Sequence, residues 1–396
     1  MIRPFNLRNA RVDRGEIAYL SPKFVADSGL KTFSPGAIMF ARVGEIGAGI
    51  NLYEETTISP NIIVAELHDT INPYFVGVFA NTQYGRMQLE AGMKVVAQPT
   101  ISTDAIRDFK IPLLNRAFQD KIAETFKQAV VKENESVDLL KQAESILICE
   151  LGLERWITPE PLTYVRNSSE AFAAGRLDAE HFQPKFVGLL NHLESTGDSE
   201  RLDSVLTTNQ RGKQPEYAEA GLPVVNSKHV LSGEVRLDTD NRKAVSDDKT
   251  FLIQTGDVLM NGTGVGTIGR CAPYLHEIKA IPDNHVTILR PKADLDPIYL
   301  SVFLNSLAGQ MQVSQRLRGS SGQIELYPND IAQFKVWVAP PETQANIRRA
   351  VENSFEQKQR ATQLLEAAKH AVEIAIEQSE ADALAYLNNI TATTGA

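Results

Sequence analysis

The hydrophobic and polar positions along the chain predict one order of elements, and they predict it twice. In each copy an apolar run enters a glycine-rich turn and a β-branched run follows, which indicates two strands. An Asn-Pro or Asp-Pro pair then opens an amphipathic helix, and another apolar run indicates a last strand. The paired strand ranges are 37–40 and 258–260, 61–64 and 285–289, and 109–113 and 334–338. This pattern predicts two copies of a compact module of mixed α and β structure.

Matching residues recur between the two halves at a nearly constant offset. The offset is 220 at the first strand, 224 at the helix and 225 beyond it, so it drifts by only five residues. Small loop insertions between two copies of one fold produce such a drift, and the repeat therefore sets the architecture. The matched pairs include Gly36 and Gly256, Asn81 and Asn305, Gly85 and Gly309, Gln88 and Gln312, and Gln119 and Gln344.

Each copy runs from its last strand into a long helix whose small and larger apolar residues follow heptad spacing. Each apolar stripe is longer than one small module can cover. We therefore favour pairing of the two helices, and packing of each helix on its own module stays open. Antiparallel pairing would place a pseudo-twofold axis near the helix midpoints, at Glu133 and Lys358. These residues either form an ion pair there or remain solvated helix charges.

These features predict an α+β fold with two similar modules joined by two long antiparallel coiled-coil helices. The second module has a leading segment at 201–221, whereas the first begins at the equivalent of Leu222 and is expected to be N-terminally incomplete. The predicted parts are a first module at 1–115, a first long helix at 116–153, a linker at 154–200, a second module at 201–340 and a second long helix at 341–390.

The formal net charge of −9 at first argues against a nucleic-acid partner. The two modules are each neutral, however, and the acidity lies on the long helices and the linker. Neutral modules can bind DNA through a local basic face, so charge leaves DNA binding open. Cys149 and Cys271 are far apart and support neither a disulfide framework nor a cysteine-rich metal site. The chain carries no apolar signal core and no membrane-length apolar run, so we expect a cytoplasmic protein.

One glycine-rich motif, residues 264–269, formally fits the G-x-G-x-x-G dinucleotide fingerprint. A dinucleotide site also needs a helix directly after the turn, and Pro273 would interrupt such a helix in its first turns. The equivalent stretch of the first copy lacks the fingerprint. A turn that lets the backbone approach another surface closely is the better interpretation. No phosphate loop, zinc-protease motif or nucleophile elbow is present, so we expect a chain without catalytic activity of its own.

A second motif, residues 316–323, combines two arginines, two serines that lie between glycines, and Gln323. Arginine, serine and backbone amides suit phosphate contacts, and glutamine or arginine can read base edges. The equivalent loop of the first module shares a glutamine, Gln98, but differs around it. A shared scaffold with divergent loops is what two modules reading different DNA sequences would need. A solvated loop with no partner is the alternative.

Several segments together resemble the target-recognition domains of Type I restriction-modification specificity subunits. The resemblance covers nearly the whole chain, and its motifs in combination are specific to this family. The segments that carry it are residues 256–264, 283–286, 319–326 and 338–344 in the second copy, residues 60–64 and 97–102 in the first, and residues 176–182, which resemble the opening of the second half.

The resemblance implies a non-catalytic subunit whose two domains read the two halves of a split DNA site. Its partners would be double-stranded DNA, methyltransferase subunits and a restriction/translocase subunit. S-adenosylmethionine, ATP and Mg²⁺ would be bound by those partner subunits and not by this chain. The candidate DNA-contacting residues are Arg42, Lys94, Gln98, Thr100, Arg211, Lys213, Lys228, Asn261, Thr263, Arg270, Arg316, Arg318, Ser320, Ser321 and Gln323.

Two other classes of function compete with this interpretation. One is a structural adaptor whose paired helices join proteins without touching DNA. The other is a nucleotide-dependent oxidoreductase built on the glycine-rich loop, and the missing second fingerprint counts against it. Binding to duplex DNA that weakens as salt rises would separate the specificity subunit from the adaptor.

Overall fold

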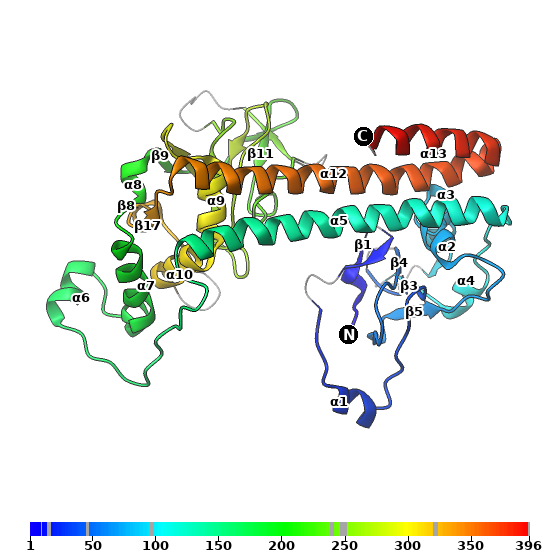
Figure 1. Cartoon of the computed structure of the whole chain (residues 1–396), viewed down its shortest axis with the longest axis horizontal. Helices are drawn as coiled ribbons and strands as arrows, with labels where there is room; N and C mark the ends of the chain where they lie inside the picture. The colour runs from blue at the N-terminus through cyan, green and yellow to red at the C-terminus, as the bar shows by residue number, and fades with distance from the viewer. Residues whose placement is uncertain are drawn as a thin grey trace. The chain divides into compact units, whose positions relative to one another are not determined.

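The computed structural model of the chain describes residues 1–8, 10–13, 17–44, 47–94, 99–237, 241–245, 252–319 and 324–394. The fold is mixed helix and sheet, as the α+β prediction requires (Figure 1). It divides into two compact units, of which unit 1 holds Met1–Ser136 and Phe355–Ala396 and unit 2 holds Val137–Ser354. The division predicted from sequence separates each module from the long helices. The two compact units are divided differently, because each contains one module together with a portion of both long helices.

Unit 1 is built on a five-stranded sheet in the order β1-β2-β4-β3-β5. The interior strand β3 is buried at all four positions, and helices α2 and α3 contribute Phe75, Phe79 and Leu89 to the same core. The strands are β1 (Leu7–Arg8), β2 (Arg11–Val12), β3 (Ile38–Ala41), β4 (Ala48–Ile50) and β5 (Ile62–Ala65), with a separate hairpin of β6 (Met93–Lys94) and β7 (Thr100–Ile101). The short helices are η1 (Pro4–Asn6), α1 (Pro22–Asp27), α2 (Pro73–Phe79), α3 (Gln83–Ala91) and α4 (Thr103–Arg107).

Unit 2 contains an antiparallel sheet in the order β14-β13-β16-β9, a second four-stranded sheet in the order β10-β12-β11-β15, and a β17-β8 pair. The strands are β8 (Ser199–Arg201), β9 (Leu206–Arg211), β10 (Tyr217–Ala218), β11 (Leu222–Val225), β12 (Lys243–Ala244), β13 (Val258–Asn261), β14 (Cys271–Pro273), β15 (Ile281–Pro282), β16 (Val286–Pro291) and β17 (Lys335–Trp337). Its short helices are α6 (Ser168–Ala174), η2 (Ala179–Phe182), α7 (Pro184–Ser195), α8 (Leu202–Val205), α9 (Pro297–Asn305), α10 (Leu307–Arg316) and α11 (Pro328–Ile331).

The repeat inferred from sequence is present in the order and pairing of the elements. Strand β3 lies between β4 and β5 in unit 1, and β13 lies between β14 and β16 in unit 2, with antiparallel pairing in both. Helix α2 begins after Asn72, whose side chain accepts a hydrogen bond from the Tyr74 amide, and α9 begins after Asp296, which caps its helix in the same way. The predicted helix starts at the two Asn/Asp-Pro pairs are therefore confirmed.

Matched polar side chains also make matched hydrogen bonds in the two units. The Gln119 side chain accepts from the Asn72 amide at 2.9 Å and donates to the Leu114 carbonyl at 2.8 Å. The Gln344 side chain accepts from the Asp296 amide and donates to the Ala339 carbonyl, each at 2.8 Å. Each glutamine therefore ties the start of its long helix to the start of the preceding module helix.

A second glutamine pair holds the last segment of each module. The Gln88 side chain exchanges two hydrogen bonds with the backbone of Lys110, and the Gln312 side chain does the same with Lys335. Gly85 and Gly309 are both needed for close packing, because a Cβ at either position would lie 2.2 Å from a backbone carbonyl oxygen. The sequence repeat is thus a repeat of specific contacts.

The two sheets differ at their edges. Strand β9 pairs with the outer edge of β16 in unit 2. The equivalent edge of β5 carries no strand among the described residues of unit 1, where β2 instead extends the sheet beyond β4. The two sheets therefore differ in their edge pairing, and the incompleteness expected of the first module stays a prediction. The predicted strand at 109–113 is wrong: its counterpart β17 pairs with β8, and the described part of unit 1 has no such partner.

The long helices are α5 (Arg116–Glu150) and α12 (Pro341–Glu377). Within unit 1 the first half of α5 and the second half of α12 share one apolar core, which also includes the module helix α2. In this unit the α5 stripe therefore lies in one core with its own module and with part of α12, and the coiled-coil pairing of the two helices stays a prediction. The shared core includes Phe118, Ile122, Phe126 and Ala129 from α5 and Leu364, Ala368, Ala371 and Val372 from α12.

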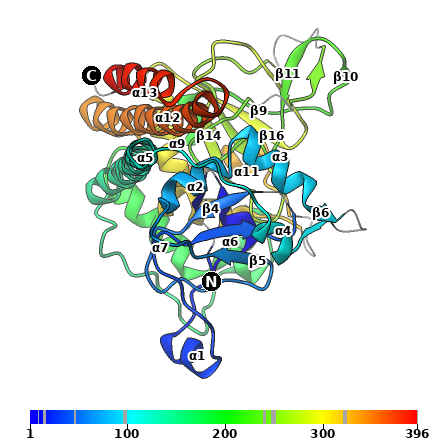
Figure 2. The same cartoon turned by 90° about the vertical axis from the view of Figure 1, so that its right-hand side faces the viewer.

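The second long helix is shorter than predicted. It ends at Glu377, and a separate helix α13 (Glu380–Thr394) begins after Ser379. The Ser379 hydroxyl accepts a hydrogen bond from the Asp382 amide, as a helix N-cap does. Figure 2 shows α13 alongside α12, in agreement with the 5.2 Å ring contact between His370 and Tyr386. The prediction of one helix over 341–390 is therefore wrong.

Glu133 has Arg11 of strand β2 as an ion-pair partner. Both side chains are more than two-thirds buried, and the pair links the first long helix to the sheet of its own module. Lys358 lines the same small hollow as these two residues. The predicted Glu133–Lys358 ion pair stays a prediction.

Candidate nucleic-acid interface

Arg211 ends strand β9 and faces the turn before β16. Its Nε donates to the Asn284 carbonyl at 2.6 Å, and Nη1 lies 3.3 Å from a Glu325 carboxylate oxygen. Gly212 follows where a Cβ would lie 2.2 Å from the Asp283 carbonyl oxygen. Arg211 therefore brings a cation to the edge of the sheet. The position after it must be glycine, because a larger residue would clash with the Asp283 carbonyl.

Three segments distant in sequence meet beside Arg211. The Gly262 amide donates to the His285 carbonyl at 2.8 Å, and the Gly262 carbonyl accepts from the Leu326 amide at 2.9 Å. Thr263 forms a β-bridge with Glu325, and its hydroxyl lies 2.8 Å from His285 Nδ1. The structure thus brings the predicted residues Arg211 and Thr263 together around Glu325.

Arg318 joins this group through the backbone of Glu325. The two residues exchange hydrogen bonds of 2.9 and 2.8 Å. The Arg318 guanidinium donates to both carboxylate oxygens of Asp330, at 2.9 and 2.7 Å, and its side chain stays 47% exposed. Gln98, Ser320, Ser321 and Gln323 lie outside the described residues. We call Arg211, Thr263, His285, Arg318 and Glu325 the Glu325 cluster.

Burial, hydrogen bonds and nearby charges shift the pKa values of the carboxyl groups in this region in opposite directions. A hydrogen bond from Tyr327 and the nearby Arg211 guanidinium lower the pKa of Glu325. Burial raises the pKa of Asp283, whose carboxylate accepts from the His285 amide at 2.9 Å. The Asp330 carboxylate raises the pKa of Arg318, so this guanidinium stays charged. The cluster therefore presents two guanidinium groups held by carboxylates and one hydroxyl held by an imidazole, and the carboxylates orient the arginine side chains for a ligand.

Two candidate residues are buried. Asn261 is fully buried, and its amide donates to the carbonyls of Ser227 and Val230. Arg316 is 8% exposed, burial lowers its pKa to about 10, and its guanidinium bonds the Gln315 side chain at 2.6 Å. Both side chains lack surface to offer to a duplex in this structure, and we withdraw them from the candidate contacts.

The other candidates of unit 2 lie on loops. Lys213 and Lys228 are exposed, and Arg270 is half-buried at the end of the glycine-rich turn. In unit 1, Lys94 and Thr100 pair across the β6–β7 hairpin. The Ile101 amide donates to the Arg42 carbonyl at 3.0 Å, which brings exposed Arg42 to the same hairpin. Three of the four candidates of the first module therefore share one edge.

The glycine-rich motif at 264–269 leads into strand β14 and not into a helix. Gly264, Gly266 and Gly269 all have positive φ angles, of 96°, 79° and 80°. A Cβ at Gly269 would lie 2.7 Å from the Val313 side chain of α10, so the turn approaches this helix closely. The geometry of a dinucleotide site is absent, and the predicted close-approach turn is confirmed.

The described residues contain no group of three or more His, Cys, Asp or Glu side chains placed to hold a metal ion. In the same part of the chain no helix is long and apolar enough to cross a membrane.

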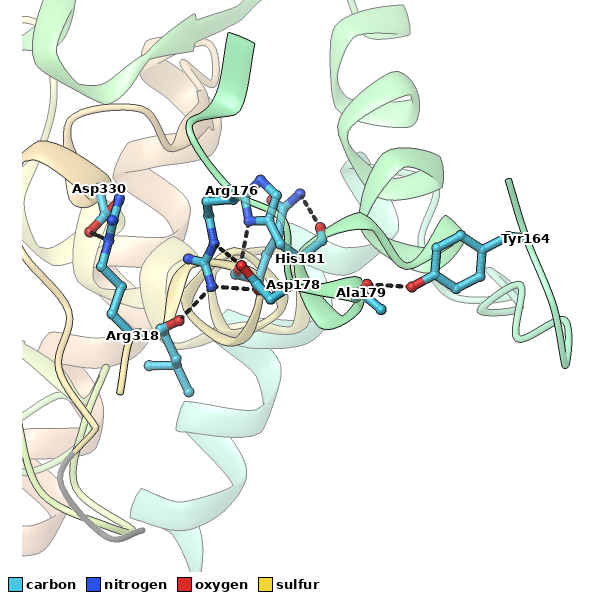
Figure 3. Close-up of polar contacts among 9 residues, drawn as sticks. Tyr164, Arg176, Asp178, Ala179, His181, Arg318 and Asp330 are labelled. Carbon is cyan, nitrogen blue, oxygen red and sulfur yellow. Dashed lines mark hydrogen bonds and ion pairs between the residues drawn. The ribbon is translucent and has the colours of Figure 1, made fainter. Parts of the chain in front are cut away.

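Sequence reasoning missed residues that hold the cluster in place. Glu325 lies at the centre of the cluster. It belongs to the resembling segment 319–326 but was not among the candidate contacts. Arg176 and His181 precede the second module and bond to the end of its helix α10, at the Leu317 and Gln315 carbonyls, and Asp178 holds Arg176 there (Figure 3). The pattern Arg-x-Asp hints at a local ion pair, but contacts across more than 130 residues leave no signal in a single sequence.

Comparisons with known proteins find the same class that the motifs resemble, the specificity subunits of Type I restriction enzymes. A curated relative is the Type I restriction enzyme EcoKI specificity subunit of Escherichia coli (strain K12), 26% identical over 200 residues. The match covers 48% of this chain and 39% of the relative, so the chain spans well under half of the relative's length. No protein-family model matches the chain.

Solved structures of the same class also resemble the chain. The HsdS subunit from Thermoanaerobacter tengcongensis is 16% identical with a TM-score of 0.30, covering 92% of this chain and 81% of the other. The Type-I restriction-modification S subunit from M. genitalium is 14% identical with a TM-score of 0.39, covering 89% and 83%. A chain from a type I R-M assembly is 14% identical with a TM-score of 0.32, covering 99% and 90%.

Proposed function

We propose that this chain is the sequence-specific DNA-binding subunit of a Type I restriction-modification complex. The observation that carries the proposal is the repeat itself. Two modules share a scaffold down to matched glutamine hydrogen bonds, while their exposed loops differ in length and residues. A scaffold that is kept while its loops diverge suits two modules that read different halves of one DNA site.

The Glu325 cluster is the proposed contact region of the second module. Arg318 and Arg211 supply cations, Thr263 and His285 supply hydroxyl and ring nitrogen groups, and glycines allow close approach of the backbone. The neighbouring Ser320, Ser321 and Gln323 extend the same chemistry along the sequence. In the first module the proposed contacts are Arg42, Lys94, Gln98 and Thr100. Lys213, Lys228 and Arg270 would add phosphate contacts.

The two long helices set the separation of the half-sites in this proposal. A helix of 35 residues such as α5 spans about 50 Å, which exceeds one turn of B-DNA, about 34 Å. An antiparallel coiled-coil arrangement with a pseudo-twofold axis would present equivalent surfaces to two copies of a methyltransferase subunit. A restriction/translocase subunit would complete the complex in the cytoplasm.

The chain itself performs no catalysis in this proposal. The methyltransferase subunits would bind S-adenosylmethionine, and the restriction/translocase subunit would use ATP and Mg²⁺.

The test is duplex binding by the chain purified with its methyltransferase subunits. Affinity for a duplex carrying the bipartite site should fall steeply as salt rises, because bound phosphates release counterions. Replacing Arg318 with alanine should relax base preference in one half-site only, and Lys141→Ala, an exposed change on α5, is the matched control. A coiled-coil adaptor without DNA binding would show no salt-dependent association with any duplex, and that result would contradict the proposal.

A further inference from the structure

The end of helix α10 lies next to the proposed DNA contacts. The helix ends at Arg316, and Leu317 and Arg318 follow directly. Carbonyl groups at the end of a helix lack partners within the helix and need outside donors. Here the donors come from a segment that precedes the helix end by more than 130 residues of chain.

Two side chains of that segment bond to this helix end (Figure 3). His181 Nδ1 lies 2.9 Å from the Gln315 carbonyl oxygen, and Arg176 Nη2 donates to the Leu317 carbonyl at 3.0 Å. Because a carbonyl only accepts, His181 carries its proton on Nδ1. The Gln315 side chain returns a bond to the His181 carbonyl at 3.3 Å.

Asp178 holds Arg176 in this position. Its two carboxylate oxygens accept from Arg176 Nε and Nη2 at 2.8 and 2.7 Å, and the arginine side chain is only 12% exposed. We call Arg176, Asp178 and His181 the helix-end clamp. A bidentate arginine–carboxylate pair has a defined geometry, so the clamp fixes the Leu317 carbonyl in space.

The clamp is separate from the attachment of its own segment. Helix α7, which follows directly, buries Phe186, Leu189 and Leu193, and its Glu194 pairs with Lys335 at 3.2 Å. The segment is therefore anchored without the clamp. The clamp instead acts on Leu317, one peptide before Arg318.

Resting on the proposed function, we infer that the helix-end clamp positions Arg318 for DNA recognition by the second module. On the far side Asp330 holds the Arg318 guanidinium, and the Glu325 backbone holds its main chain. The clamp fixes the remaining side, the peptide that leads into Arg318. Arg176, Asp178 and His181 are thus positioning residues for sequence discrimination, although they lie in the connecting segment.

The experiment compares Arg176→Ala, Arg318→Ala and the double variant in the complex with its methyltransferase subunits. Binding is measured on the cognate duplex, on duplexes altered in either half-site and on non-specific duplex, over a range of salt. We expect Arg176→Ala to lower discrimination at one half-site about tenfold, a loss the size of one mismatched base pair. Non-specific affinity and the salt slope should stay unchanged, and the double variant should lose no more than Arg318→Ala.

A second variant, His181→Phe, keeps a ring beside Phe182 but removes the donor to Gln315, and should show the same pattern more weakly. Arg155→Ala, an exposed arginine of the same connecting region, is the matched control. Unchanged discrimination in both clamp variants would overturn the inference. So would a uniform loss with a salt slope shallower by about one, which marks a direct phosphate contact. Absence of sequence-specific binding by the wild-type complex would instead overturn the proposed function, and the inference with it.

Discussion

At the scale of single residues, Gln119 and Gln344 make the same contacts in the two modules. Both side chains are 5% exposed, and each satisfies a backbone amide before a helix and a carbonyl before a long helix. Glutamine fits this position because its amide both accepts and donates. An apolar residue of similar size would fill the space and leave both backbone groups unpaired.

We therefore expect Gln344→Leu to destabilise unit 2 by about 1–3 kcal/mol, the cost of leaving buried backbone groups unpaired. Gln119→Leu should have the same effect on unit 1. Urea unfolding followed by circular dichroism measures the change, and Gln128→Leu on the exposed face of α5 is the control, with a change within about 0.5 kcal/mol. Equal stability of all three variants would show that these matched hydrogen bonds contribute nothing.

His181 links the helix-end clamp to pH. Burial lowers its pKa, and the neighbouring Arg176 and Arg316 lower it further, while the Gln315 carbonyl and Asp178 act in the opposite direction. A histidine with a lowered folded pKa stabilises the fold above its unfolded pKa of about 6.5. That contribution is lost as pH falls through the lowered value.

The stability gap between wild type and His181→Phe should therefore be larger at pH 7.5 than at pH 5.5, because only the wild type loses a buried neutral imidazole on acidification. Urea unfolding at the two pH values measures both gaps. A gap that widens toward acid would mean that the protonated ring is the stabilised form, contrary to the burial seen here.

At the scale of elements, the sequence located the repeated strands β3, β5, β13, β16 and β17, the two capped module helices and the two long helices, and it left most short strands and helices unpredicted. The caps Asn72 and Asp296 are local signals, and both helices begin where predicted. The segment predicted as a strand at 109–113 has no strand partner among the described residues of unit 1, and its own sequence cannot reveal this. Ser379 is a local capping signal for the start of α13. The apolar pattern continues through it and therefore hides the end of α12 in the sequence.

The candidate site was only partly predictable for the same reason. Arg211, Thr263 and Arg318 were named from sequence and lie around Glu325, because glycines and loop arginines mark such regions. Asn261 and Arg316 were named as well and are buried, since polarity alone does not reveal exposure. The clamp depends on pairing between distant segments, and no local pattern predicts it.

The packing of helix α13 against the core of unit 1 can be tested by substitution. Leu387 is fully buried in the core that it shares with α12 and the first module. Leu387→Ala should destabilise unit 1 by about 2–5 kcal/mol through lost burial and a cavity. Asn388→Ala, on the exposed face of the same helix, should change stability little. Urea unfolding distinguishes the two, and a small effect at Leu387 would show that α13 does not pack as described.

At the scale of the whole molecule, a net charge of −9 and DNA binding are compatible because charge and contacts lie in different parts of the chain. The two modules are neutral, and arginines gather locally around Glu325. Because the module is repeated, the proposed function predicts one bipartite DNA site with one half for each module.

The most direct measurement is methylome sequencing of cells that express the methyltransferase partner with and without this chain. The account predicts that one bipartite methylation motif appears only when the chain is present. It also predicts that Arg318→Ala relaxes one half of that motif and leaves the other intact. A methylome that is identical with and without the chain would contradict the central claim.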